Sequence, residues 1–257
     1  MSEFDSDWAK IEQACSKVDT DRLWRMHEEM ATFGAIPGPG VNRQAFSDED
    51  IAARKKLMAL LSPHDFEIFV DDIANIFIRR SGRNNDLPPL MTGSHMDSQP
   101  SGGRFDGIYG VLAGLEVLFA LEDAELETDH PIEVVAWSNE EGSRFAPGAM
   151  GSMVYTGERN LESLLDVVDG NGISLRDALP ATLAATPHAR VRDFKTPVAA
   201  YIEAHIEQGP LLEETEKIIG VVDGIQGTRW FSVDVKGESA HAGTTPVASR
   251  KDALQAA

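Results

Sequence analysis

Hydrophobic residues recur at helical spacing in several parts of the chain. This spacing between Asp7 and Ala31 predicts one or two helices. Ser47, with Asp50 three positions later, resembles an N-terminal capping signal, so we expect a helix from there to about Leu61. A mostly apolar stretch, Gly107–Leu121, predicts a further helix.

Short runs rich in β-branched and aromatic residues lie between these helices and predict strands. The expected strands are 66–70, 73–78, 90–92 leading into His95, 132–137, 199–205 and 218–222. The run Ile132–Trp137 (IEVVAW) is apolar throughout, which is typical of a strand covered on both faces. Because strands and helices alternate, we expect an α/β layered domain.

The pattern changes after Gly224. The segment Thr228–Lys236 (TRWFSVDVK) alternates apolar and polar residues, as expected of an antiparallel strand with one solvated face. We therefore predict a domain boundary near Asp223, with one domain over residues 1–223 and the start of another over 224–257.

Composition and charge narrow the function classes. The 257 residues are 42% hydrophobic, enough for a sizeable core, and the net charge is 23 − 42 = −19. No basic patch interleaved with aromatic residues is present, so nucleic acid and anionic membranes are poor partners. The longest apolar segment, Ile108–Leu121, contains Glu116 and is too short for a membrane span. Cys15 is the only cysteine and the N-terminus does not resemble a signal peptide, so we expect a cytoplasmic protein.

Several potential metal ligands stand where apolar runs give way to glycine and polar residues. His95 and Asp97 lie two residues apart, so their side chains point the same way on an extended backbone. This suits His95 as a ligand and Asp97 as a group beside the metal that restricts the orientation of the imidazole. Asp106 follows a glycine-rich loop and is placed to bridge two ions, although an aspartate before Gly107 also suits the N-cap of the next helix.

Two adjacent carboxylates, Glu140 and Glu141, directly follow the apolar strand. Such a pair is costly unless a cation or a proton shares it. We assign Glu141 to a metal and Glu140 to the role of general base and later general acid. A solvated acidic turn is the alternative.

Three polar residues further along the chain are candidates for the same site. His205 lies on the expected strand 199–205 and is either a metal ligand or an ordinary strand histidine. Gln208 at the end of that strand can hydrogen-bond a substrate. His241, in the small-residue sequence GESAHAGTTP, lies where a ligand can approach closely.

Two long stretches carry a family resemblance. GSHMDSQPSGGRFDGIYGVLAGLEVL and SNEEGSRFAPGAMGSMVYTG resemble the N-carbamoyl-L-amino acid hydrolase (hydantoinase/carbamoylase) branch of the M20-type dinuclear-metal amidohydrolases, and the resemblance extends from position 40 over nearly the whole chain. It implies a layered, zinc-peptidase-like catalytic domain with a mixed central sheet. From about Gly224 it implies an inserted α+β lid and dimerisation domain.

The resemblance also implies the metal ligands. His95, Asp106 and His205 would hold one ion, and Asp106 would bridge to a second ion held also by Glu141. The two divalent ions would be Zn²⁺, Mn²⁺, Co²⁺ or Ni²⁺, since imidazole and carboxylate accommodate all four. The last ligand of the second ion is a histidine near the C-terminus in the family, and no candidate precedes Ala257. We therefore expect an incomplete polypeptide.

Roles in catalysis follow from the same resemblance. Glu140 would be the general base, Asp97 the residue behind the metal ligand, and Gln208 a substrate contact. His241 would stabilise the oxyanion, reaching the active site of the partner subunit in a homodimer.

The expected reaction is hydrolysis of the ureido C–N bond of N-carbamoyl-L-amino acids to the L-amino acid, carbon dioxide and ammonia. An allantoate or β-ureidopropionate amidohydrolase, or an M20-type peptidase or deacylase, would use the same ligands. A catalytically silent binding protein of the same fold is the alternative outside enzymes, and metal analysis separates the two classes.

Overall fold

The computed structural model describes residues 3–227, 229 and 231–256. The chain forms two compact units, Met1–Gln208 and Gly209–Ala257. The boundary predicted near Asp223 falls within the second unit and stays a prediction.

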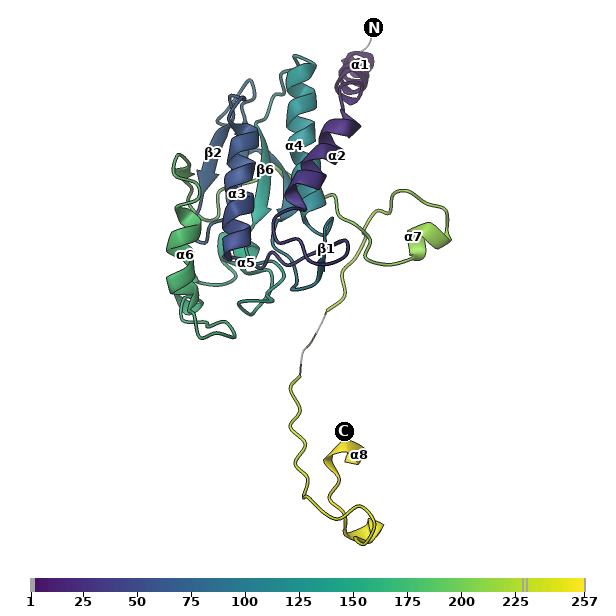
Figure 1. The fold of residues 1–257 in the computed structure, drawn as a ribbon. Coiled ribbons are helices and arrows are strands. Elements are labelled where there is room, and N and C mark those ends of the chain that lie inside the picture. Colours follow the sequence, from purple (N-terminus) through teal and green to yellow (C-terminus); the bar gives the residue numbers. More distant parts are fainter. Residues whose placement is uncertain (1–2, 228, 230, 257) are drawn as a thin grey trace. The chain divides into compact units, whose positions relative to one another are not determined.

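A six-stranded mixed sheet forms the centre of the first unit (Figure 1). Its strand order is β7-β2-β3-β6-β4-β8, and β3 runs antiparallel to the other five. The strands are β2 (Glu67–Val70), β3 (Ile76–Arg80), β4 (Leu90–His95), β6 (Ile132–Trp137), β7 (Arg190–Val191) and β8 (Ala200–Ile202). A separate antiparallel pair joins β1 (Gly40–Val41) to β5 (Gly102–Gly103). The layered α/β architecture with its mixed central sheet confirms the sequence prediction.

Helices cover both faces of this sheet. The helices α2, α3 and α4 lie together on one face (Figure 1), where they contribute to an apolar cluster. On the other face, Tyr155 of α5 packs against Phe77 and Val135. The helices of this unit are α1 (Glu3–Cys15), α2 (Thr20–Met30), α3 (Asp48–Leu61), α4 (Ile108–Asp123), α5 (Met150–Thr156) and α6 (Leu175–Leu183), with a short 3₁₀ helix at Leu161–Ser163. Ser47 caps α3 as predicted, because its side chain accepts a hydrogen bond from the Asp50 backbone amide.

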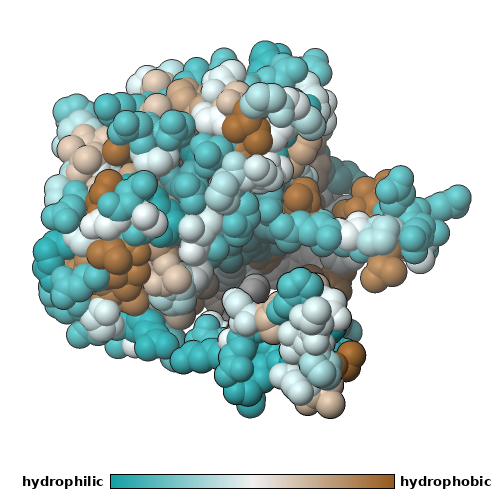
Figure 2. All heavy atoms as spheres, turned by 60° about the horizontal axis from the view of Figure 1, so that its bottom comes forward, coloured by the Kyte–Doolittle hydropathy of each residue, from teal (hydrophilic) through white to brown (hydrophobic). Residues whose placement is uncertain are grey.

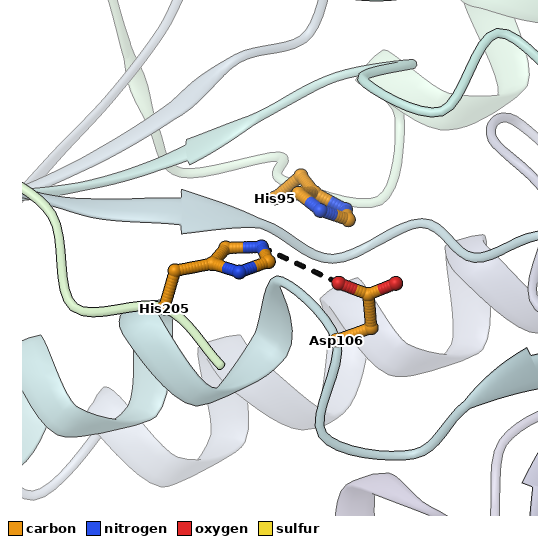
Figure 3. A group of neighbouring side chains, drawn as sticks. All are labelled: His95, Asp106 and His205. Atoms are coloured by element: carbon orange, nitrogen blue, oxygen red, sulfur yellow. Dashed lines mark ion pairs between the residues drawn. The ribbon is translucent and has the colours of Figure 1, made fainter. Parts of the chain in front are cut away.

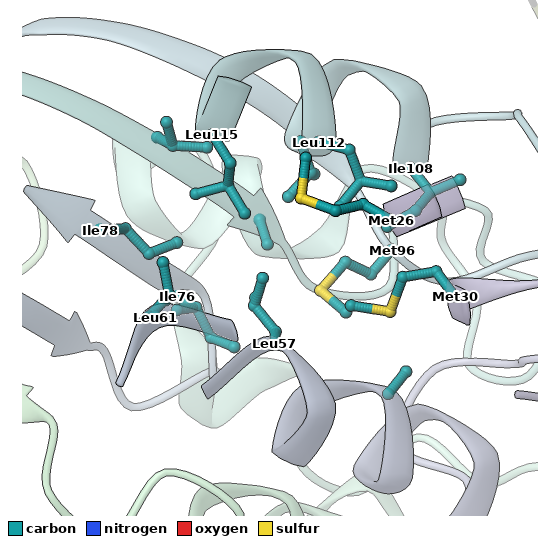
Figure 4. Close-up of a cluster of buried hydrophobic side chains, with 14 of the residues drawn as sticks. Met26, Met30, Leu57, Leu61, Ile76, Ile78, Met96, Ile108, Leu112 and Leu115 are labelled. Carbon is teal, nitrogen blue, oxygen red and sulfur yellow. The ribbon is translucent and has the colours of Figure 1, made fainter. Parts of the chain in front are cut away.

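The larger apolar cluster lies between the sheet and helices α2, α3 and α4 (Figure 4). Leu57 of α3 and Leu112 and Leu115 of α4 are fully buried there against Ile76 of β3. Burying each such side chain stabilises the fold by about 1.5–3 kcal/mol before conformational entropy is subtracted. This packing holds α4, and the loop that precedes it, on the central strands.

The position of the central strands determines where the polar residues gather. β4 and β6 are parallel and in register from Leu90 opposite Ile132 to His95 opposite Trp137, so both end at the same edge of the sheet. β8 is parallel to β4 on its other side. The residues that follow β4, β6 and β8 therefore meet at the carboxyl ends of these strands. Ligands of open α/β sheets bind at that end.

The second unit contains little regular structure among its described residues. It has the helix α7 (Leu211–Glu214), the 3₁₀ turn η2 (Val247–Ser249) and the helix α8 (Ala253–Ala256). The strand predicted over 218–222 is wrong, since Ile218 and Val221 are more than four-fifths exposed and unpaired in sheets of the described chain. Residues 228 and 230 of the other predicted strand lie outside the described residues, and 231–236 are not in a strand. An alternating pattern favours a strand, but a strand forms only with a neighbour that takes its backbone hydrogen bonds.

Among the described helices, none is both long and apolar enough to cross a membrane.

Candidate metal centre

Three of the predicted ligands come together at the edge where β4 and β8 end. His95 is the last residue of β4, Asp106 lies in the loop before α4, and His205 follows β8 (Figure 3). One ligand atom from each lies within 4.8 Å of the other two, and His205 Nε2 is 3.3 Å from Asp106 Oδ1. This group has the geometry of a cation site made of two imidazoles and a carboxylate.

The histidine rings are oriented by backbone carbonyls. His95 Nδ1 lies 2.9 Å from the Asp97 carbonyl oxygen, and His205 Nδ1 lies 2.8 Å from the Ile206 carbonyl oxygen. Because a carbonyl oxygen only accepts, each Nδ1 carries the proton in these contacts. The lone pair of each Nε2 is therefore free for a metal, the arrangement that protein metal sites use to fix an imidazole tautomer.

Gly107 lets His95 occupy this position. Its φ is 64°, and a Cβ atom built on it would lie 2.3 Å from His95 Nε2, so a larger residue would occupy the place of the imidazole. Gly107 is also the N-cap of α4, which has no side-chain capping bond. The interpretation of Asp106 as a helix cap is therefore wrong: its Oδ2 instead accepts a hydrogen bond from Gln208 Nε2 at 2.8 Å.

The segment that carries His205 is anchored to β4 by contacts that the sequence analysis missed. We predicted that His205 lies on the strand β8, and that prediction is wrong. β8 ends at Ile202, so His205 lies beyond it. Glu203 accepts hydrogen bonds from Ser94 Oγ at 2.5 Å and from Tyr201 Oη at 2.7 Å. Ser94 is the neighbour of His95, so this contact ties the two histidine-bearing segments together. In the sequence, the presence of Ser94 inside an apolar strand was the signal that could have indicated this contact.

Asp97 holds the two glutamates that follow β6. Its carboxylate oxygens accept hydrogen bonds from the backbone amides of Glu140 and Glu141, each at 3.1 Å. Asp97 Oδ1 is also 3.6 Å from His95 Nδ1. Asp97 thus orients the imidazole through its backbone carbonyl and the glutamate pair through its buried carboxylate.

The two glutamates have different surroundings. The Glu140 side chain is 42% exposed, and its Oε2 is 3.5 Å from His95 Nε2. Glu141 Oε2 accepts a hydrogen bond from Gln99 Nε2 at 2.7 Å, whereas its Oε1 is buried with no hydrogen-bond partner among the described residues. Glu140 is therefore the more accessible carboxylate, and Glu141 the more constrained one.

Burial and crowding of charge shift the pKa values of these groups in the chain alone. Burial raises the pKa of Asp97 to about 6 against the opposing charge of His95. Burial also raises the pKa of Glu140, and the charge of Glu141 adds to the effect. Burial disfavours the charged ring of His95, but Asp97 and Glu140 outweigh it and raise that pKa. A divalent cation would favour the deprotonated form of all three groups.

Two buried carboxylate oxygens support a cation here. Asp106 Oδ1 and Glu141 Oε1 make no hydrogen bond within the described part of the chain although neither contacts solvent. Buried polar atoms almost always have a partner, and an orphaned pair calls for an explanation such as an ion. Oxygen donors beside imidazole nitrogens suit borderline divalent metals.

His241 lies in the second unit and has its own fixed orientation. Its Nδ1 accepts hydrogen bonds from the backbone amides of Gly243 and Thr244, each at 3.1 Å. Nδ1 is therefore the acceptor, so the proton of the neutral ring is on Nε2. His241 thus presents an N–H donor.

A cavity of about 420 Å³ lies beside Glu140. Its wall includes the aromatic rings of Trp137, Tyr155 and Tyr201 together with Glu203. It gives the edge of the sheet a recess next to the proposed base.

The chain is similar to known hydrolases in its sequence. The family model described as peptidase family M20/M25/M40 matches residues 91–257. An N-carbamoyl-L-amino-acid amidohydrolase of Rhizobium meliloti is 40% identical over 237 residues, which cover 92% of this chain and 56% of that protein. A ureidoglycolate hydrolase of Oryza sativa subsp. japonica is 35% identical over 244 residues, 93% of this chain and 50% of that protein.

A solved structure is similar over nearly the whole chain. The crystal structure of a hydantoinase/carbamoylase family amidase from Burkholderia ambifaria has a TM-score of 0.80 and 47% identity, and the match covers 93% of this chain and 58% of that one. This chain therefore spans little more than half the length of the relatives it matches.

Proposed function

Because the chain belongs to the M20/M25/M40 peptidase family, we propose that the protein hydrolyses the ureido C–N bond of N-carbamoyl-L-amino acids to the L-amino acid, carbon dioxide and ammonia. The observation that carries this proposal is the group of His95, Asp106 and His205, with the Glu140 carboxylate 3.5 Å from the same His95 ring. The amidohydrolase from Rhizobium meliloti named above supports the choice of a carbamoyl substrate.

Four side chains of this site would bind two metal ions. His95, Asp106 and His205 would hold one ion, and Asp106 and Glu141 would contribute to a second, each ion being Zn²⁺, Mn²⁺, Co²⁺ or Ni²⁺. When bound, such ions supply Lewis-acid polarisation of a carbonyl and a lowered pKa for water.

Glu140 moves the proton. Its exposed carboxylate takes a proton from the attacking water as the oxygen adds to the ureido carbonyl carbon, and passes that proton to the departing nitrogen. One water is consumed overall, and the carbamoyl group leaves as carbon dioxide and ammonia. Asp97 keeps Glu140 in place through the Glu140 backbone amide.

Gln208 and His241 would contact the substrate. The Nε2–H of His241 is the donor that a developing oxyanion needs, since Nδ1 is occupied by backbone amides. The amide of Gln208 lies 2.8 Å from Asp106 Oδ2, which places it beside the proposed metal ligands. We assign His241 to the active site of the partner subunit in a homodimer.

Ammonia release tests the proposal. The longest natural polypeptide that contains this sequence is incubated with Mn²⁺ or Zn²⁺ and N-carbamoyl-L-amino acids, N-carbamoyl-β-alanine, allantoate, ureidoglycolate or a dipeptide. We expect metal-dependent ammonia from the N-carbamoyl-L-amino acids.

The other substrates distinguish the alternatives. The ureidoglycolate hydrolase of Oryza sativa among the relatives favours ureidoglycolate as the second candidate. Ammonia from ureidoglycolate, allantoate or the β-alanine derivative alone would keep the mechanism and change the substrate. Cleavage of the dipeptide alone would indicate a peptidase, and no product from any substrate with metal bound would contradict the substrate class.

A further inference from the structure

Gln99 lies against the proposed metal ligand Glu141 and holds one of its two oxygens. Gln99 Nε2 donates to Glu141 Oε2 at 2.7 Å and is 3.4 Å from the Glu141 carbonyl oxygen. Glu141 Oε1 is buried and has no hydrogen-bond partner among the described residues. The amide therefore fixes one carboxylate oxygen and leaves the other for a different ligand.

The same arrangement occurs at Asp106. Gln208 Nε2 donates to Asp106 Oδ2 at 2.8 Å, whereas Oδ1 makes no hydrogen bond within the described chain and faces His205. A side-chain amide is a neutral donor, so it orients a carboxylate without cancelling the charge that attracts a cation. In both pairs the oxygen without a hydrogen-bond partner is buried.

The backbone that carries Gln99 is firmly held. The Ser98 amide donates to the Arg43 carbonyl at 2.9 Å, and the Arg43 amide donates to Ser98 Oγ at 2.8 Å. The Gly102 amide closes the following turn onto the Gln99 carbonyl at 3.1 Å, next to the β1–β5 pair. Arg43 is 1% exposed, so this anchor is part of the core. The anchored backbone thus fixes the point from which the exposed Gln99 side chain extends to Glu141.

We propose that Gln99 is a positioning residue of the metal centre, which turns Glu141 so that Oε1 is directed to a divalent cation. The inference rests on the proposed function, because it takes Glu141 as a ligand of the second ion. Gln99 acts through Glu141 and touches neither substrate nor the reacting atoms. Its loss is expected to weaken one ion selectively.

Metal affinity tests this role directly. The longest natural polypeptide containing this sequence is stripped of metal and titrated calorimetrically with Zn²⁺ or Mn²⁺, as it stands and as Gln99→Met. Methionine keeps the length of the side chain and removes the donor. We expect the Kd of one ion to rise about 10- to 100-fold, as for other residues that orient metal ligands, while the Kd of the other ion is unchanged.

A second variant and a matched control separate positioning from folding. Gln99→Asn keeps an amide that is one methylene too short, and we expect it to weaken the same ion. Gln13→Met is the control, because Gln13 Nε2 donates to the Ala124 carbonyl at 2.9 Å, at the end of α4 remote from Asp106. It should leave both Kd values unchanged.

Three results would overturn the inference. Equal Kd values for both ions in Gln99→Met and the unchanged protein would remove the role of Gln99 and leave the proposed function intact. Loss of both ions together with a lowered unfolding midpoint in both Gln99 variants would indicate a structural role. If Glu141→Ala leaves both Kd values unchanged, Glu141 is not a ligand, and the second ion of the proposed function fails with it.

Discussion

Glu140 and Glu141 are neighbours in the sequence, yet the tertiary structure gives them different surroundings. Asp97 holds both backbone amides, so the two side chains start from a fixed point and diverge. The Glu141 carboxylate is held by Gln99, whereas Glu140 is 42% exposed on the side of the His95 ring. A proton carrier needs such access to solvent and substrate, and a ligand needs constraint.

Glu140→Gln tests this division. We expect turnover to fall about 10²- to 10⁴-fold, because the amide cannot accept the proton of the attacking water. Metal content by elemental analysis should stay the same, since the predicted ligands are untouched. Glu12→Gln on the exposed side of α1 is the matched control with normal turnover. Near-normal turnover of the Glu140→Gln protein would contradict the assignment of Glu140 as the general base.

His27 is a second residue whose surroundings predict a measurable effect. Its ring stacks on Tyr109 with centroids 5.7 Å apart and meets the edge of Phe105, and neither ring nitrogen has a hydrogen-bond partner among the described residues. Burial, assisted by the charge of Arg104, lowers the pKa of His27 to about 4. The imidazole is therefore neutral in the folded protein at neutral pH.

The stability of the fold should consequently fall in mild acid. Between about pH 6.5 and pH 4 the unfolded chain binds a proton at His27 that the folded chain does not, so this residue contributes less stability as pH falls. The contribution is complete above pH 6.5, and its loss changes the unfolding equilibrium constant by at most about tenfold per pH unit. Urea unfolding of the unchanged protein and of His27→Phe across this range measures it. Parallel pH profiles of the two proteins would contradict the assignment.

At the residue scale the sequence identified the side chains better than their contacts. His95, Asp106 and His205 were selected because their residue types and settings suit metal chemistry, and the structure brings them within 4.8 Å. Gln99 was missed because an amide in a glycine-rich loop has no distinctive pattern. Its role depends on Glu141, which is 42 positions away in the sequence.

At the scale of elements, the loop after β6 is clamped by the start of α5. The backbone amides of residues 149, 150 and 151 donate to the carbonyls of residues 140, 139 and 138. Asn75 completes the clamp, since its Oδ1 accepts from the Ser138 amide at 2.8 Å and its Nδ2 donates to the Gly151 carbonyl at 3.0 Å. The position of Glu140 therefore depends on how closely α5 approaches β6.

Gly151→Ala tests that close approach. A Cβ atom at Gly151 would lie 2.2 Å from Asn75 Oδ1 and 2.6 Å from the Ser138 carbonyl oxygen, so the helix must shift. We expect the free energy of unfolding to fall by about 1–3 kcal/mol, the usual cost of overpacking. Turnover should fall as Glu140 moves with the loop. Gly170→Ala, where an added Cβ meets nothing within 4 Å, is the control with normal stability and turnover.

The strands show where the hydrophobic pattern of the sequence predicts the sheet correctly and where it does not. The strand predicted at 132–137 agrees with β6, because an apolar run in the middle of a sheet has neighbours on both sides. The predicted strand at 199–205 is only three residues long in the structure, since β8 is an edge strand that pairs, among the described strands, with β4 alone. Central strands follow from the pattern, whereas edge strands depend on the partner.

At the scale of the whole molecule, charge and partition into units are the main features. Figure 2 shows hydrophilic side chains over much of the visible face, with hydrophobic residues in separate groups. A net charge of −19 repels polyanions, and the absence of a nucleic-acid partner stays a prediction. The cytoplasmic location and the homodimer remain predictions.

Mixing two inactive variants tests whether His241 acts across a dimer. In a mixed dimer of Glu140→Gln and His241→Ala, the subunit that retains Glu140 receives an intact His241 only from its partner. We expect coexpression to restore about a quarter of the normal activity, since half of the dimers are mixed and one of their two sites is complete. Size-exclusion chromatography with light scattering checks that a dimer forms. A mixture as inactive as either variant alone would place His241 in the active site of its own subunit.

The sequence by itself determined the class of the fold, the helical regions that became α1 to α4, the central strands, and the residue types of a candidate metal centre. Hydrophobic periodicity and short polar clusters are local properties, and a local pattern is enough to specify an element and the chemistry at its end. Only the tertiary structure decided that Asp106 faces His205 rather than capping α4, that Gln99 holds Glu141, and that Asp97 spaces the glutamate pair. These contacts join segments that are distant in the chain. The register and packing of the parallel strands fix which atoms meet, and a local sequence pattern does not specify that register or packing.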